Sequence, residues 1–224
     1  MDITSIEAAL RSIGLVSRGA LHPRPEDDVP ALPDGRPTGT VVLAGNVGTS
    51  MWEAFQKARS HAQEAHPLNS WTREVVTSVA AEFGAQALFP FDGPPYLPFQ
   101  RWAQRAEPVT PSPIGPLIHP DYGLWHAYRG ALVFAERIEI PPLAPRRSPC
   151  ETCIDKPCLS ACPVDALAPG DYDLAACLDH IGSDAGTDCL RRSCLARRAC
   201  PVGRRYQYPP PQARFHMKAF LRNA

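Results

Sequence analysis

Residues 150–163 of the 224-residue chain read CETCIDKPCLSACP, and residues 177–201 read CLDHIGSDAGTDCLRRSCLARRACP. These two stretches hold all eight cysteines of the protein, four in each, and each stretch ends in a Cys-Pro pair. The sequence before residue 150 contains no cysteine. This distribution predicts a cysteine-free body and a cysteine-dense C-terminal module.

The spacing of the cysteines resembles that of a two-cluster bacterial ferredoxin. The first group is C-x2-C-x4-C-x3-C-P and the second is C-x11-C-x4-C-x5-C-P, whereas the usual run is C-x2-C-x2-C-x3-C-P. Iron in a sulfide cluster is soft and favours thiolate donors. In such ferredoxins the cysteine before the proline ligates the other cluster. The resemblance therefore implies one [4Fe–4S] cluster on Cys150, Cys153, Cys158 and Cys200, and a second on Cys162, Cys177, Cys189 and Cys194.

Two other uses of the cysteines stay open beside iron–sulfur clusters. Four disulfides need an oxidising compartment, and the first 25 residues lack the apolar run and cleavage site of a secretory signal. Structural zinc favours paired C-x2-C units, and the chain has one such pair, Cys150 and Cys153. Neither use explains the two Cys-Pro endings. The sequence thus favours two [4Fe–4S] clusters and a cytoplasmic location.

The charges are balanced overall but unevenly placed. The chain has 23 Lys and Arg against 23 Asp and Glu, which argues against nucleic acid or a membrane surface as its partner. From Arg191 to the end there are nine Lys and Arg and no acid. We expect these cations to offset the negative charge of thiolate-bound clusters. The alternative is an RNA-facing patch, for which interleaved aromatic residues are few, among them Tyr206, Tyr208 and Phe215.

The body shows mixed helix and strand patterns. Apolar spacing and capping residues, among them Ser50, Glu53 and Asn69, predict helices over residues 2–13, 50–63, 69–83 and 100–106. Strands are predicted over residues 40–44, 87–91 and 130–140, and a surface loop over residues 23–37. We expect an α+β protein with a body over residues 1–144, a two-cluster module over residues 145–210 and a C-terminal helix over residues 211–224.

Residues 45–50, GNVGTS, join a predicted strand to a predicted helix. The segment matches neither GxGxxG nor GxxxxGK[ST], so a tight turn is the simpler interpretation. The alternative is a helix N-terminus that presents N–H groups to an anionic ligand.

Residues 116–143 read PLIHPDYGLWHAYRGALVFAERIEIPPL. This segment resembles the cytosolic cobalamin-trafficking and decyanating family, which has a similar order of His-Pro, aromatic-Gly, Trp and Arg-Gly before an aliphatic strand. A strand that runs into a cysteine module also resembles epoxyqueuosine reductases and reductive dehalogenases, which join a nitroreductase-derived, corrinoid-binding α/β body to two [4Fe–4S] clusters. The combination resembles an iron–sulfur cobalamin reductase. The corrinoid contacts that it implies are His119, Tyr122, Gly123, Trp125, Tyr128 and Arg129.

The resemblance implies a defined reaction. The protein would bind cobalamin base-off and pass single electrons from the clusters to cobalt, reducing cob(II)alamin to cob(I)alamin, while an external reductase, ferredoxin or flavodoxin supplies the electrons. An axial ligand raises the energy of the cobalt orbital that accepts the electron, so apolar side chains that exclude axial water favour reduction. The candidates for that role are Trp52, Phe89, Phe91 and Trp125.

Two other functions stay open. One is a ferredoxin-type electron carrier whose body docks a partner enzyme and has no corrinoid affinity. The other is transfer-RNA modification like that of epoxyqueuosine reductase, although only about 20 residues follow Cys200. Each residue of the 116–143 segment also has a plain structural interpretation: Trp125 and Tyr128 as core, Arg129 as an ion-pair member and His119 as part of a surface turn.

Overall fold

The structure is a computed structural model that describes residues 2–58, 61, 63–144, 146–168 and 170–223. The chain forms two compact units. Unit 1 comprises Met1–Pro108 and His126–Pro145, and unit 2 comprises Val109–Trp125 and Arg146–Ala224. One division thus falls at the start of the predicted cysteine module. In addition, residues 109–125, which the sequence analysis assigns to the body, group with the cysteines.

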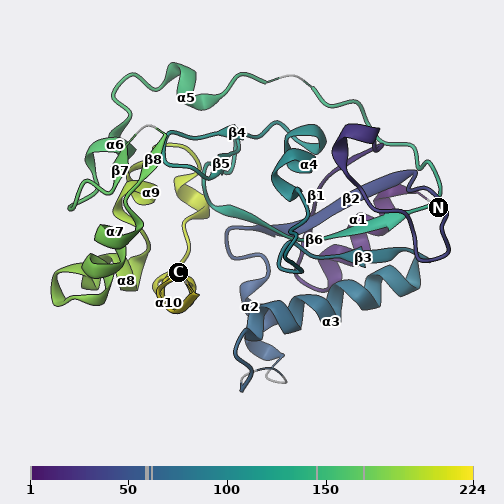
Figure 1. The fold of residues 1–224 in the computed structure, drawn as a ribbon, viewed down its shortest axis with the longest axis horizontal. Helices are drawn as coiled ribbons and strands as arrows, with labels where there is room; N and C mark the ends of the chain where they lie inside the picture. Colours follow the sequence, from purple (N-terminus) through teal and green to yellow (C-terminus); the bar gives the residue numbers. More distant parts are fainter. Residues whose placement is uncertain (1, 59–60, 62, 145, 169, 224) are drawn as a thin grey trace. The chain divides into compact units, whose positions relative to one another are not determined.

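Unit 1, the body, is built around a four-stranded antiparallel sheet (Figure 1). The strand order is β1-β2-β6-β3, with bounds β1 Val16–Leu21, β2 Thr40–Val47, β6 His126–Phe134 and β3 Gln86–Leu88. Its helices are α1 Ile3–Ser12, η1 Pro25–Asp27, α2 Trp52–Lys57, α3 Pro67–Glu82 and α4 Phe99–Ala106. The α+β class is confirmed, and the antiparallel pairing of these strands distinguishes the body from a parallel α/β sheet.

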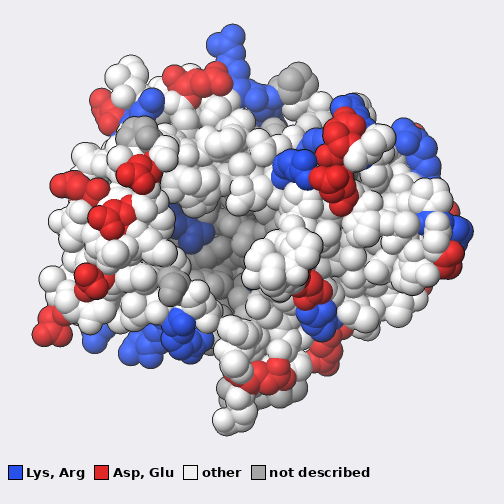
Figure 2. Space-filling model, viewed as in Figure 1, with Lys and Arg blue, Asp and Glu red and all other residues white. Residues whose placement is uncertain are grey.

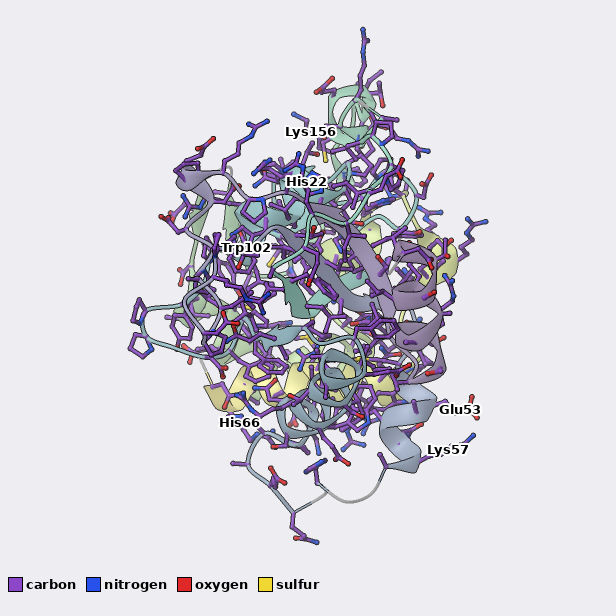
Figure 3. All side chains as sticks on the ribbon, turned by 90° about the vertical axis from the view of Figure 1, so that its right-hand side faces the viewer. His22, Glu53, Lys57, His66, Trp102 and Lys156 are labelled. Carbon is purple, nitrogen blue, oxygen red and sulfur yellow. The ribbon has the colours of Figure 1, made fainter. Side chains whose placement is uncertain are left out.

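The central strands are apolar because both faces of the sheet are covered. Val41 to Ala44 of β2 and Ala131 to Phe134 of β6 are fully buried, as is typical of strands between two layers of helices. In Figure 1, α3 and α4 lie on opposite sides of the sheet. Trp102 of α4, labelled in Figure 3, is fully buried and donates its indole N–H to the Asp27 carbonyl at 2.7 Å.

The pairing of β2 with β6 contains a bulge that the sequence does not reveal. Ala44 pairs with Gly130 and Gly45 pairs with Tyr128, so Arg129 is the extra residue. A bulge redirects side chains and bends the strand that carries it. At Gly45 the two strands approach so closely that a β-carbon would lie 2.0 Å from the Ala127 carbonyl oxygen.

The boundaries of β2 and α2 differ from the prediction. β2 continues to Val47 because Gly45 and Asn46 pair with β6, so the first half of GNVGTS is strand. The predicted cap at Ser50 is wrong: its hydroxyl accepts from the Val47 N–H at 3.2 Å, and α2 begins without a side-chain cap. Glu53 and Lys57 form an exposed ion pair at 2.7 Å along α2 (Figure 3). The rest of the predicted helix includes residues 59, 60 and 62, which lie outside the described residues.

The boundaries of α3, β3 and β6 also differ from the prediction. α3 begins at Pro67, two residues before the predicted cap, because proline is favoured at the first helical position. β3 ends at Leu88 rather than residue 91, and β6 spans His126–Phe134 rather than residues 130–140. After Phe134 the chain is held by Thr40, whose hydroxyl donates to the Glu136 carbonyl at 2.8 Å and accepts from the Ile138 N–H at 2.9 Å.

Unit 2 is a set of short helices and two small hairpins. The hairpins are β4 Thr110–Pro111 with β5 Leu117–Ile118, and β7 Leu167–Ala168 with β8 Asp171–Tyr172. The helices are α5 Pro149–Thr152, α6 Pro157–Ser160, α7 Leu174–Gly182, η3 Asp184–Gly186, α8 Thr187–Arg192, α9 Leu195–Ala199, η4 Arg204–Tyr206 and α10 Pro210–Asn223. The last of these confirms a C-terminal helix. Of the described helices, none has the length and apolarity to cross a membrane.

The segment before Trp125 joins unit 2 through a close contact between two glycine turns. A β-carbon on Gly123 would lie 2.1 Å from the Val202 carbonyl oxygen, and one on Gly203 would lie 2.2 Å from the Tyr122 carbonyl oxygen. Both glycines have positive φ, 58° and 71°. Only glycine allows this backbone conformation together with such an approach. Gly123 therefore has a structural role in joining residues 109–125 to the chain that follows Cys200.

Candidate functional site

The first group of thiols lies in unit 2 around α5, α6 and the end of α9. Burial raises the pKa of the Cys158 thiol, and the neighbouring thiols that raise it further are Cys200, Cys150 and Cys153. Burial also raises the pKa of the Cys150 thiol, Cys200 and Cys153 raise it further, and a hydrogen bond from Ser148 opposes their effect. Apolar side chains, among them Ile118, Leu124 and Val202, pack around Cys150 and Cys200. Cysteines from both ends of the module thus meet at one place.

The second group of thiols lies around α7, α8 and the β7–β8 hairpin. Burial raises the pKa of the Cys177 thiol, a hydrogen bond from Tyr172 lowers it, and the nearby thiols of Cys194 and Cys162 raise it again. Cys189 is buried, and Cys194 raises its pKa in addition to burial. The Sγ of Cys162 accepts from the Ala166 N–H at 3.4 Å.

All eight cysteines are free thiols. Within the part of the chain that the structure describes, no three His, Cys, Asp or Glu side chains are arranged to hold a single metal ion. Burial raises the pKa of the Cys189 and Cys200 thiols, and hydrogen bonds from the Leu195 N–H and the Val202 N–H oppose this rise. N–H groups directed at sulfur stabilise thiolate charge.

The charges around the two groups are mixed. The positive charges of Lys156 and Arg204 act on the first group, at Cys150 and Cys200. Arg198 acts on Cys189 of the second group and is bonded to Asp188. Figure 2 shows acidic and basic side chains next to one another at several places on this face of the molecule. The excess of cations after Arg191 therefore lies in the same unit as the thiols.

His119 and Tyr122, two of the predicted corrinoid contacts, lie together in unit 2. Their rings stack with centroids 4.1 Å apart and an interplanar angle of 18°. The Nδ1 of His119 accepts from the Asp121 and Tyr122 N–H groups at 3.0 and 3.3 Å. The His119 side chain is buried, so it closes the turn, whereas the Tyr122 ring stays half-buried.

Trp125 is fully buried in unit 2. It packs against Tyr208 and Ala213, with its ring 5.3 Å from that of Tyr208 at 73°. The guanidinium of Arg197 lies over both rings, 4.4 Å from Trp125 and 4.8 Å from Tyr208, and donates to the Leu124 carbonyl. Arg197 thus covers this small core. The indole Nε1 of Trp125 is buried, and no described residue accepts its hydrogen bond.

Tyr128 belongs to a buried charge network in unit 1. Its hydroxyl donates to Glu107, which also accepts from Arg18 at 2.5 and 3.2 Å. Another N–H of Arg18 points at the Nδ1 of His126, 3.1 Å away. Because Arg has no acceptor, that nitrogen of His126 accepts and its proton lies on Nε2. Burial, together with the charge of Glu107, holds the pKa of Tyr128 well above its usual range.

Arg129 is half-buried and points toward α3. It donates to the Oδ1 of Asn69 at 2.8 Å and to the Thr72 hydroxyl at 3.1 Å. Its guanidinium lies 5.7 Å from the centre of the Phe91 ring, which stacks on Phe89. The six predicted contacts therefore fall into four surroundings: Trp125 with Arg197, the His119 turn that includes Tyr122 and Gly123, Tyr128 in the Glu107 network, and Arg129 against α3.

The aromatic residues predicted to exclude axial water from cobalt each pack against another aromatic ring. Phe89 is buried and Phe91 half-buried, and the Arg73 guanidinium lies 4.6 and 5.2 Å from their ring centres. Half-buried Trp52 lies 5.8 Å from Phe55, ring to ring. Phe91 and Trp52 are therefore the partly exposed rings of the body among the four candidates.

Sequence reasoning missed Arg18 and Glu107, and it counted Arg197 among the cations near the cysteines without its packing on Trp125. Arg18 is 1% exposed, and its partner Glu107 is 89 residues away in the chain. Neither residue lies in a motif. A lone arginine in the alternating pattern of β1 was the only available signal for Arg18.

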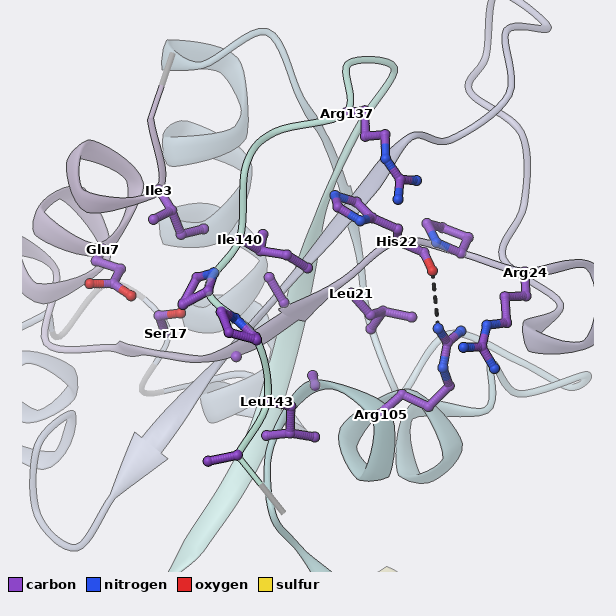
Figure 4. Close-up of a pocket in the computed structure, with 17 residues that line it drawn as sticks. Ile3, Glu7, Ser17, Leu21, His22, Arg24, Arg105, Arg137, Ile140 and Leu143 are labelled. Carbon is purple, nitrogen blue, oxygen red and sulfur yellow. Dashed lines mark hydrogen bonds between the residues drawn. The ribbon is translucent and has the colours of Figure 1, made fainter.

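A cavity of about 530 Å³ in unit 1 lies between β1, α4 and residues 137–144 (Figure 4). Arg105 donates to the His22 carbonyl at 3.2 Å across one end of it and is also bonded to Asp27. None of the predicted corrinoid contacts lines this cavity. It is therefore a feature of the body that the sequence analysis did not anticipate.

Comparison with known proteins identifies the fold. No protein-family model matches the sequence, and no curated protein matches it. Among solved structures, the chain is similar to the B12-trafficking protein CblC of C. elegans, a human MMACHC homologue, with a TM-score of 0.54 and 15% identity over 97% of this chain and 95% of that one. It is also similar to epoxyqueuosine reductase of Bacillus subtilis, with a TM-score of 0.54 and 13% identity over 92% of this chain and 67% of that one.

A third similarity is to a reductive dehalogenase described in terms of B12-dependent dehalogenation, with a TM-score of 0.53 and 11% identity over 96% of this chain. The chain spans only 34% of that protein's length. At these identities the likenesses establish the fold. They confirm, at that level, the expected relationship to the cobalamin-trafficking, epoxyqueuosine reductase and reductive dehalogenase structures.

Proposed function

We propose that the protein is an iron–sulfur oxidoreductase that binds cobalamin base-off and reduces cob(II)alamin to cob(I)alamin. The proposal is carried by eight free thiols in one unit. The charges of Cys150, Cys153 and Cys200 act on the pKa of Cys158, and those of Cys162 and Cys194 act on the pKa of Cys177. Unit 1 adds a body whose fold is shared with a B12-trafficking protein and a B12-dependent dehalogenase.

The residues of unit 2 fit two iron–sulfur clusters. A [4Fe–4S] cluster is held by four thiolates, and each group would supply four. One ligand set is Cys150, Cys153, Cys158 and Cys200, and the other is Cys162, Cys177, Cys189 and Cys194. Backbone N–H groups of Ala166, Leu195 and Val202 stabilise thiolate charge at three of these positions. When bound, such clusters supply one-electron transfer. The nearby cations Lys156 and Arg204 offset part of the added negative charge.

The body supplies the corrinoid side of the proposal. The half-buried Phe91 ring, stacked on Phe89, would shield a bound corrinoid from water, and the Arg129 guanidinium beside Phe91 would supply a hydrogen-bond donor to it. The reaction adds one electron to cob(II)alamin and yields cob(I)alamin, with the electron supplied by an external one-electron donor protein. Gly123 and Trp125, two of the predicted corrinoid contacts, have a structural role within unit 2 in this proposal and do not contact the corrinoid.

An anaerobic EPR titration of cob(II)alamin with the holoprotein tests the proposal. Base-off binding removes the nitrogen superhyperfine splitting of the cobalt signal at one equivalent of protein. Arg129→Gln is expected to weaken binding at least about tenfold, the loss of about 1.4 kcal/mol. Arg101→Gln, which alters an exposed cation paired with Asp28, serves as the control. A cob(II)alamin spectrum that stays unaltered beside intact cluster signals rules the proposed function out.

A second candidate function is reduction of a base in RNA. It is favoured by the similarity to an epoxyqueuosine reductase bound to a tRNA stem loop, with a TM-score of 0.50 and 13% identity over 68% of that chain, and by the acid-free C-terminal end. Binding of a tRNA stem loop, with an affinity that falls steeply with salt, supports this candidate whether or not the protein alters the EPR spectrum of cob(II)alamin.

A further inference from the structure

The cavity of about 530 Å³ in unit 1 separates β1 from residues 137–144 (Figure 4). β1 is the outer strand of the sheet, and the open edge of such a strand can pair with an extended segment beside it. The segment across the cavity carries Pro141 and Pro142, and proline has no N–H to donate. Residues 137–144 stay outside the sheet, and the cavity occupies the space between the two segments.

His22 fixes the start of the segment that faces β1. Its Nε2–H donates to the Ile138 carbonyl at 2.9 Å, and the Ile138 side chain is buried. Beyond that contact, Ile140 is half-buried and Leu143 is 45% exposed, and both side chains line the cavity (Figure 4). The cavity thus has an aliphatic wall that is held in place and still has apolar surface for a ligand to cover.

The charged side chains that line the cavity are unevenly distributed. Glu7 lies at one side, where it pairs with Arg11 of the same helix at 3.8 Å (Figure 4). The basic side chains lie at the other side and are His22, Arg24, Arg105 and Arg137. Because cations predominate there, this end of the cavity favours an anion.

The three arginines differ in how far their charge is already offset. Arg105 is paired with the buried carboxylate of Asp27. Arg24 lies 3.9 Å from Glu26, and both side chains are largely exposed, so water screens that pair. Arg137 is exposed, and no described acidic side chain forms an ion pair with it. An anion in the cavity would therefore meet Arg137 first, with Arg24 as a second cation.

The lining of the cavity limits the kind of molecule that fits it. A guanidinium binds carboxylate and phosphate groups through two parallel hydrogen bonds. The volume lies in the range that holds a small organic molecule. Among the described residues that line the cavity there is no Phe, Tyr or Trp, so an aromatic ligand would have no such ring to stack on. An alkyl chain, in contrast, can pack against Leu21, Ile140 and Leu143.

We infer that this cavity binds a small aliphatic acid. The acid places its carboxylate or phosphate group on Arg137 and Arg24 and its alkyl chain against Ile140 and Leu143. The site is formed entirely by unit 1 and needs neither cluster nor cobalamin. The inference therefore goes beyond the proposed function and can be tested separately from it.

The test is isothermal titration calorimetry of the full chain, purified under anaerobic conditions, with octanoate and with octyl phosphate. Both anions are expected to bind, and the one with the lower Kd identifies the preferred acidic group. Octylammonium has the same alkyl chain with the opposite charge and is expected not to bind. Hexanoate should bind more weakly than octanoate, by up to about fourfold for each methylene that it lacks.

Two variants locate the ligand in the cavity. Arg137→Gln is expected to weaken binding of both anions at least about tenfold, because it removes a charged hydrogen-bond donor. Leu143→Asn shortens the apolar wall at an exposed position and should reduce the difference between hexanoate and octanoate. Arg101→Gln, whose cation is exposed and paired with Asp28 outside the cavity, is the control and should bind as the wild type does. Circular dichroism verifies that each variant is folded.

Three results would overturn the inference. The first is the absence of binding by both octanoate and octyl phosphate at millimolar concentration. The second is binding of octylammonium as tight as that of octanoate, which would show that the charge of the ligand is not recognised. The third is a folded Arg137→Gln that binds both anions with the affinity of the wild type.

Discussion

Glu107 is the acceptor for two buried or half-buried donors, Arg18 and Tyr128. Removing one member of such a network leaves a buried charge without its partner, which typically costs about 3–5 kcal/mol. We therefore expect Glu107→Ala to lower the free energy of unfolding by about that amount in urea titrations. Asp34→Ala breaks the exposed pair with Arg36 and should leave the free energy of unfolding nearly unchanged, because water screens such a pair. Equal effects of the two variants would contradict a structural role for the network.

Gly123 offers a second test at the scale of one residue. Its β-carbon would collide with the Val202 carbonyl, whereas Gly115 also has a positive φ, 98°, but has nothing within 4 Å of the position of a β-carbon. Gly115→Ala therefore pays only the cost of the left-handed backbone, about 1–2 kcal/mol. Gly123→Ala is expected to cost clearly more in thermal unfolding and to reduce iron content. Equal losses of thermal stability in Gly115→Ala and Gly123→Ala would show that the close contact of Gly123 with Val202 does not contribute to stability.

At this scale the sequence predicts the cysteines better than the other site residues. The cysteines are close along the chain, so their spacing limits how they can meet. Arg18 and Glu107, or Arg197 and Leu124, are 89 and 73 residues apart, and no local pattern links them. The buried position of Trp125 beneath Arg197 follows from a tertiary contact that residues 116–143 alone do not contain.

At the scale of elements, helices with a clear apolar period are predicted well and boundaries set by pairing are not. α1 and α4 lie within a residue of their predicted ranges. β2 runs past its predicted end because β6 supplies partners for Gly45 and Asn46. The short elements of unit 2 have too few residues to show a period, and their turns are determined by the thiols and by contacts such as that of Gly123.

His61 links the segment before α3 to the helix itself. Its Nδ1 lies 2.6 Å from Glu64 and its Nε2 2.6 Å from Glu74. Both nitrogens must donate to carboxylates, so the ring is protonated, and the hydrogen bonds to Glu64 and Glu74 raise its pKa. A raised pKa in the folded state means that the stabilisation is present below about pH 6.5 and is lost as the pH rises through the higher folded value.

The prediction is a urea midpoint that falls modestly between pH 6.5 and pH 9 in the wild type. The decrease should be smaller in His61→Gln, because the glutamine cannot become charged. His22→Gln is the control, since His22 bonds the Ile138 carbonyl rather than a carboxylate. If the urea midpoint of His61→Gln depended on pH in the same way as that of the wild type, His61 would not contribute to the pH dependence of stability.

At the scale of the whole molecule, the two groups of thiols predict how iron content responds to mutation. Two [4Fe–4S] clusters hold about eight irons per chain, four in each. Cys153→Ala and Cys177→Ala should each reduce iron by about half, and the double variant should lose nearly all of it. Anaerobic reconstitution followed by iron and sulfide analysis measures this. Loss of all iron from either single variant would contradict two separate clusters.

The overall architecture is where sequence and structure agree most closely. Composition separates the cysteine-rich region from the rest, and the resemblance of residues 116–143 points to folds that the structural comparison also finds. The assignment of residues 109–125 to unit 2 is the main difference. It could not be foreseen because it depends on two glycines, Gly123 and Gly203, that are 80 residues apart.

The central claim is that electrons pass from this protein to cobalt. The most direct measurement is a single turnover: the holoprotein is reduced with dithionite, freed of excess reductant under anaerobic conditions and mixed with one equivalent of cob(II)alamin. We predict that the cob(II)alamin EPR signal disappears, that the absorbance of cob(I)alamin appears and that the clusters lose one electron for each cobalt reduced. The Cys153→Ala, Cys177→Ala double variant should produce none of these changes. A cob(II)alamin signal that persists beside fully reduced clusters would contradict it.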